Sequence, residues 1–150
     1  MHRIWQGLLA GAAGSTALNI VTYLDMVYRA RPPSQTPEQS AGRLADRLHL
    51  NLGSEQAAAN RRSGLGPLLG YAAGLGAAAL YAAIAPRHLG RPLATGSLAV
   101  LAMLASDAPM TLLGVTDPRR WSAADWATDI VPHIAYGAVT AATLRALAPA

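Results

Sequence analysis

The sequence of 150 residues contains no cysteine, no phenylalanine and no lysine, and few of its residues are charged. The lack of cysteine excludes a disulfide scaffold and any metal or redox site built on thiolates. Only 13% of the residues are charged, against about a quarter in an average soluble domain, and 52% are hydrophobic. A chain this apolar is not disordered, and its length suits one domain.

Long stretches without charge are the clearest feature of the sequence. Residues 4–24, 63–86 and 130–144 contain no Asp, Glu, Lys or Arg, and residues 92–116 contain only Asp107. A helix needs about 20 mainly apolar residues to cross a bilayer. The segment 75–85 is apolar on every side, which a small soluble bundle could not bury. We therefore expect an integral membrane protein.

The chain, residues 1–150, is predicted to be one all-α membrane domain, a bundle of four transmembrane helices. The predicted spans cover residues 4–28, 64–85, 92–113 and 123–146. The last of these qualifies if residues 126–129 lie in the membrane interface, where polar groups are tolerated. Residues 14–25 match residues 96–107 at four of twelve positions, which would make the bundle a duplication of two parallel helical hairpins.

The polar loop, residues 29–62, is predicted to contain a short amphipathic helix. Thr36 and Pro37 form a helix start, and four apolar residues then follow at helical spacing: Ala41, Leu44, Ala45 and Leu48. Such a helix either packs on its own bundle or lies on the bilayer surface.

Arginine counts indicate how the chain is oriented. Four arginines lie on the side of the termini: Arg3, Arg87, Arg91 and Arg145. Eight lie on the side of the two longer loops: Arg29, Arg31, Arg43, Arg47, Arg61, Arg62, Arg119 and Arg120. The positive-inside rule places these loops in the cytoplasm and both termini outside. The net charge of +4 therefore reflects membrane topology, and no nucleic-acid partner is expected.

Several polar side chains fall within the predicted spans, on the side of the polar loop. They are Asn19, Asp25, Asp107, Asp129, His133 and Tyr136. Because ionisable groups are costly inside a bilayer, each is a candidate functional residue.

Three interpretations of this polar cluster stay open. The groups can be structural. Asp25 and Asp129 then pair with Arg29, Arg31 or Arg120, and His133 bonds to a carboxylate or a backbone carbonyl. They can instead form a path for protons or a substrate through the bundle. In the third interpretation, Asp107, Asp129 and His133 bind a divalent metal, since Asp129 and His133 share one helix face. The sequence contains no metal or nucleotide motif, and no cofactor is expected.

Small residues recur every fourth position in two of the predicted spans. They are Gly7 and Gly11 in the first span, and Gly66, Gly70 and Gly74 in the second. This spacing allows close helix contact, either within the chain or between two copies in a homo-oligomer.

Three segments carry a family resemblance: Trp-Gln-Gly-Leu-Leu-Ala-Gly at residues 5–11, Leu-Gly-Val-Thr-Asp-Pro at residues 113–118, and the pattern of Trp126, Asp129, His133, Tyr136 and Gly137. With these the chain resembles small four-span actinobacterial membrane proteins of unknown function and is distantly similar to the YagU-like inner-membrane proteins. The resemblance implies a multi-pass protein of the bacterial cytoplasmic membrane and no particular reaction.

The sequence thus predicts an accessory, structural or partner-binding membrane component whose main partner is the lipid bilayer, with a homo-oligomer or another membrane protein as further partners. A small oligomeric transporter or proton-conducting bundle is the alternative, and a metal-dependent membrane enzyme is the third hypothesis. Enzyme activity is the less favoured expectation.

Overall fold

The computed structural model describes residues 2–86 and 89–148. Most of the described residues are helical, and no strand occurs among them. The helices are α1 (Arg3–Arg29), α2 (Thr36–Arg47), α3 (Glu55–Ile84), α4 (Arg91–Leu112) and α5 (Ala123–Ala146), with a short 3-10 helix, η1 (Pro118–Arg120), before α5. Arg87, one of the arginines used to predict the orientation, lies outside the described residues.

Three of these helices, α1, α3 and α4, are long and apolar enough to cross a membrane. Helix α5 has 24 residues but is not among them, and Asp129 and His133 lie within it. The prediction of an all-helical chain is confirmed, while the structure supports three candidate spans rather than clearly four.

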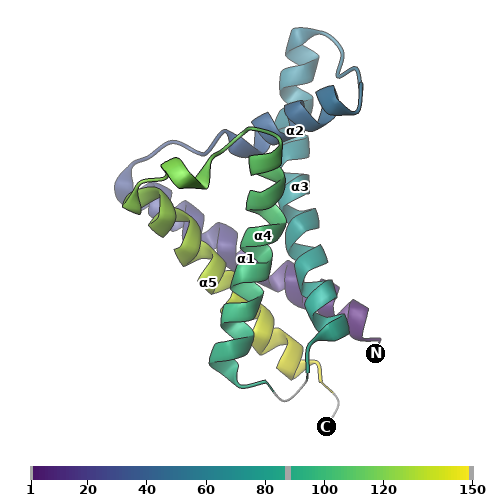
Figure 1. The fold of residues 1–150 in the computed structure, drawn as a ribbon, viewed down its shortest axis with the longest axis vertical. Helices are drawn as coiled ribbons and strands as arrows, with labels where there is room; N and C mark the ends of the chain where they lie inside the picture. The colour runs from purple at the N-terminus through teal and green to yellow at the C-terminus, as the bar shows by residue number, and fades with distance from the viewer. Residues whose placement is uncertain (1, 87–88, 149–150) are drawn as a thin grey trace.

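The four long helices pack in a closed cycle. Helix α1 contacts α3 and α5, and α4 contacts the same two helices from the other side. Figure 1 shows α1 and α5 side by side, crossing the more upright pair of α3 and α4. One end of this assembly, here called the terminal end, contains the start of α1, the end of α3, the start of α4 and the end of α5. The opposite end, here called the loop end, contains the other ends of the same helices.

Helix α2 packs against α3 at the loop end, which agrees with the predicted alternative in which this helix packs on its own bundle. Its apolar face is turned inward, since Ala41 and Ala45 are buried, whereas Leu48 is exposed. Helix α3 begins earlier than its predicted span and continues through Gly64 as one helix of 30 residues. At 1.5 Å per residue it is about 45 Å long, so its first turns can extend past a hydrocarbon core of about 30 Å. In Figure 1 these turns and α2 project beyond the other helices.

The contact between α1 and α3 depends on two glycines at the terminal end. A Cβ atom at Gly7 would lie 2.6 Å from the Cα atom of Ala79, and one at Gly11 would lie 2.9 Å from the Cα atom of Leu75. Neither distance leaves room for a side chain, so the two backbones approach as closely as the small-residue pattern allows.

The three glycines predicted to form a packing ridge on α3 face different surroundings. Gly66 packs against Pro37 of α2, and Gly74 packs against the hydroxyl of Ser15 on α1. A Cβ at Gly70 would meet none of the described atoms within 4 Å. Gly66 and Gly74 therefore serve contacts within the chain, and Gly70 lies on the outer surface.

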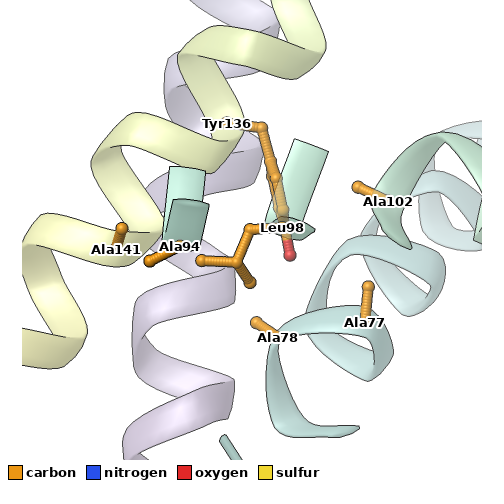
Figure 2. Close-up of a cluster of buried hydrophobic side chains, with 7 residues drawn as sticks. All are labelled: Ala77, Ala78, Ala94, Leu98, Ala102, Tyr136 and Ala141. Atoms are coloured by element: carbon orange, nitrogen blue, oxygen red, sulfur yellow. The ribbon is translucent and has the colours of Figure 1, made fainter. Parts of the chain in front are cut away.

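A small core fills the space between the four helices. It consists mostly of alanine, with Leu98 and Tyr136 as its large side chains: Ala77, Ala78, Ala94, Leu98, Ala102, Tyr136 and Ala141. Figure 2 shows Tyr136 reaching from α5 into this alanine-lined space. The outer surface, in contrast, carries many exposed large apolar side chains on all four long helices, among them Leu24, Leu68, Leu104 and Ile134. Such a surface suits contact with lipid.

Candidate functional site

Three of the predicted site residues come together at the loop end. Asp107 lies near the end of α4, and Asp129 and His133 lie on the early turns of α5, which runs back antiparallel to α4. The turn between the two helices is held by Asp117, which caps η1, and by a reciprocal capping box of Ser122 and Asp125. This turn sets the two helices against each other.

Asp129 and His133 are linked along one face of α5. The Nδ1 atom of His133 lies 2.8 Å from the backbone carbonyl oxygen of Asp129 and 3.4 Å from its Oδ1 atom. The His133 and Asp129 side chains are 10% and 20% exposed. Because a carbonyl only accepts hydrogen bonds, Nδ1 is the protonated ring nitrogen in this geometry.

Asp107 and Asp129 form a pair of carboxyls across the contact between α4 and α5. The two carboxyls lie near each other, and His133 is close to both. The Asp107 Oδ1 atom accepts a hydrogen bond from the hydroxyl of Ser106 over 3.2 Å. The Oδ2 atom of Asp129 is buried and has no hydrogen-bond partner among the described residues. A buried carboxyl oxygen without a partner is costly, which sets this pair of carboxyls apart from Asp25.

Asp25 is held apart from this cluster by arginines that follow it on the chain. The Nε atom of Arg31 lies 2.5 Å from Oδ2 of Asp25, and the Nε atom of Arg29 lies 3.3 Å from Oδ1. These pairs neutralise the carboxylate at the end of α1. Asp25 is therefore bonded to arginines at the end of α1 and is not part of the cluster of Asp107, Asp129 and His133.

Asn19 and Tyr136 connect helices rather than extend the cluster. The Asn19 Nδ2 atom donates to the hydroxyl of Tyr71 over 3.3 Å, which links α1 to α3. The Tyr136 hydroxyl donates to the backbone carbonyl of Gly74 over 2.5 Å, which links α5 to α3 inside the core.

The described residues contain no group of three or more His, Asp or Glu side chains placed to hold a metal ion. Asp107, Asp129 and His133 are near one another but do not form such a group. The metal hypothesis therefore stays a prediction.

Sequence reasoning missed a second polar group, at the terminal end of the assembly. Arg3, Gln6, Tyr81 and Arg145 line a cavity between the helix ends there. The arginines were interpreted only as topology signals. Their common position could have been noticed from the sequence, because antiparallel spans bring the start of α1 beside the end of α5.

The chain matches no protein-family model, no curated protein and no solved structure. The YagU-like resemblance thus stays a prediction, and the function has to be argued from the geometry.

Proposed function

We propose that this protein is a four-span component of a bacterial cytoplasmic membrane with an accessory, structural role, and that α5 is the fourth span. Contacts along the whole of α5 support its crossing. Its first turns meet α4 at Asp107, its middle bonds to Gly74, and Gln6 at the start of α1 donates to the carbonyl of Leu147 over 2.7 Å. At 24 residues, α5 is about 36 Å long, enough to cross the hydrocarbon core.

The observation that carries the structural role is that three of the predicted site residues are bonded within the same chain. Asp25 is paired with Arg31 beyond the end of α1, Asn19 with Tyr71, and the Tyr136 hydroxyl with a backbone carbonyl. The last two bonds join different helices, and in a bilayer such bonds help to hold helices together. These residues are thus used in assembling the bundle, while the apolar outer surface meets lipid or another membrane protein.

The carboxyl pair of Asp107 and Asp129 favours a second candidate function, proton exchange across part of the bundle. Two carboxyls and an imidazole close together inside the helices, with one Asp129 oxygen that has no hydrogen-bond partner among the described residues, are the kind of groups from which intramembrane proton paths are built. Four helices leave little space for a complete path, so this function would require an oligomer.

Proton flux into reconstituted vesicles separates the two proposals. The purified protein is placed in liposomes containing a pH-sensitive dye, and a pH step is applied with valinomycin present to balance charge. A structural component gives the flux of empty liposomes. Flux that is lost in Asp129→Asn with His133→Gln, and kept in the exposed control Asp46→Asn, would contradict the structural role and establish the second candidate.

A further inference from the structure

The cavity at the terminal end has the composition of an anion site. It has a volume of about 90 Å³ and lies where the start of α1 meets the ends of α3 and α5 and the start of α4. Two arginines, a glutamine and a tyrosine supply its polar lining, and the rest of the wall is apolar, with Ala82, Leu89 and Leu144 among its residues.

Both arginines of this cavity are fixed by backbone carbonyls. The Nη2 atom of Arg3 donates to the carbonyl of Ala85 over 2.5 Å, and the Nη2 atom of Arg145 donates to the carbonyl of Leu89 over 2.9 Å. A guanidinium has five N–H donors, so each arginine keeps most of its donors for another group. In the part of the chain that the structure describes, no carboxylate forms a salt bridge with either arginine. The cavity therefore contains two positively charged arginine side chains in fixed positions, and each has N–H groups available to bind a ligand.

An apolar groove adjoins this cavity on the outer surface. Tyr81 lines both, and the groove continues along α4 past Gly96, Ser97, Val100, Leu101 and Leu104. Val100 and Leu104 are 55% and 58% exposed. The groove thus leads from the helix ends toward the middle of the membrane-spanning part of α4, the direction that an acyl chain takes from its headgroup.

We propose that this site binds an anionic phospholipid, with the phosphate at Arg3 and Arg145 and one acyl chain in the groove between α3 and α4. Guanidinium groups recognise phosphate oxygens through paired N–H donors, and basic pockets between membrane helices bind lipid headgroups. The ends of α1, α3 and α4 lie at headgroup depth if these helices cross the bilayer. The lipid is favoured over a free phosphate ion because an apolar groove lies beside the cavity, with Tyr81 lining both. This site rests on the proposed membrane crossing of the helices, and it does not depend on the structural role or on proton exchange.

Native mass spectrometry of the full chain in a neutral detergent tests this proposal. Dioleoyl phosphatidylglycerol, dioleoyl phosphatidylcholine and glycerol 3-phosphate are added separately. We expect phosphatidylglycerol to be retained in preference to the other two. In Arg3→Gln with Arg145→Gln the retained fraction should fall roughly tenfold. The control Arg119→Gln with Arg120→Gln removes the same charge from exposed side chains at the loop end and should bind like the wild type.

A groove variant keeps the proposal testable if the arginine variant does not fold. In Gly96→Leu both arginines stay, and a side chain fills the groove at a position where a Cβ meets no described atom within 4 Å. This variant should weaken phosphatidylglycerol binding. The proposal would be overturned if the two phospholipids were retained equally, or if the folded variants bound phosphatidylglycerol like the wild type. It would also be overturned if glycerol 3-phosphate bound as tightly as the whole lipid, which would show a free-phosphate site.

Discussion

The terminal end and the loop end of the helical assembly are held together by different contacts. At the terminal end, α1 and α3 meet through Gly7 and Gly11, and α5 meets α4 through Gly137, all with almost no side-chain volume between the backbones. The loop end of these helices has carboxyls instead: Asp25 is bonded to Arg31 just beyond the end of α1, and Asp107 lies near Asp129 where α4 meets α5. Polar contacts also occur at the terminal end, but there Arg3 and Arg145 bond to backbone carbonyls, and no carboxylate pairs with them among the described residues. Close backbone approach tolerates no added atom, whereas polar contacts respond to charge and pH, so the two ends should fail differently under mutation.

The largest effect is expected at the terminal end, from Gly137→Leu. A Cβ at Gly137 would collide with the backbone carbonyl of Thr95 and lie 3.0 Å from the amide nitrogen of Ala99. Backbone cannot move aside cheaply, so the free energy of unfolding should fall by about 3 kcal/mol, the upper part of the usual range for overpacking. Unfolding by SDS in mixed micelles, followed by circular dichroism, measures this loss. The control Gly70→Leu, on the outer surface, should unfold like the wild type. A similar loss in both variants would remove the contrast between packed and open glycines.

At the loop end, Asp25→Asn should have a smaller effect. The substitution removes the charge that Arg31 and Arg29 share, in a pair whose Asp25 side chain is 27% exposed. We expect the free energy of unfolding to fall by about 1–2 kcal/mol, between the values for exposed pairs and for charged hydrogen bonds in partly buried sites. The same SDS titration measures it. A loss that equals that of Gly137→Leu would show that the polar end is as constrained as the packed end.

Tyr136→Phe tests the buried hydrogen bond between the Tyr136 hydroxyl of α5 and the backbone of α3. It removes the donor to the carbonyl of Gly74 and keeps the ring among Ala77, Ala78 and Leu98. The expected cost is about 1 kcal/mol, the typical net value of one hydrogen bond. Tyr136→Leu should cost more, because it also loses ring packing. Equal costs for the two variants would mean that the hydroxyl carries the whole contribution.

The smallest effect concerns pH at the exposed turn before α5. Side-chain hydrogen bonding from Arg119 holds the pKa of Asp117 below its usual range. A lowered pKa in the folded state means that the carboxylate stabilises the turn at neutral pH, and that this contribution is lost as the pH falls through the lowered pKa. In an NMR titration, Arg119→Gln should raise the pKa of Asp117 toward its ordinary value of about 3.9. An unmoved pKa would show that Arg119 is not its cause.

The charge-free runs were sufficient to predict helices over most of the chain, because a run of 20 apolar residues has few alternatives to a helix. The capping box at Ser122 and Asp125 also follows from residue spacing and is present. The sequence does not specify that residues 55–62 and the following span form one helix. Gly64 lies between them, and an isolated glycine is found both inside helices and near their ends.

Less of the candidate site could be predicted from the sequence. The common depth of Asp25, Asp107, Asp129 and His133 follows from helix direction, but which of them touch depends on helix rotation and on competing partners. The pairing of Asp25 with nearby arginines is a prediction that the structure confirms. Arg29 follows at i,i+4 spacing, and Arg31 lies beyond the helix end and turns back to the same carboxylate. The Arg3 and Arg145 cavity depends on how four helix ends meet, which a single sequence does not specify.

The proposal that α5 crosses the membrane is tested most directly by the side on which each loop is exposed. The chain has no cysteine, so His2→Cys, Asn51→Cys and Ala148→Cys can each serve as a single reporter. A membrane-impermeant maleimide is applied to intact spheroplasts and to inverted vesicles. We predict that residues 2 and 148 are labelled from the same side, the outside, and residue 51 from the other. Labelling of residue 148 together with residue 51 would show that α5 does not cross and would contradict the four-span assembly.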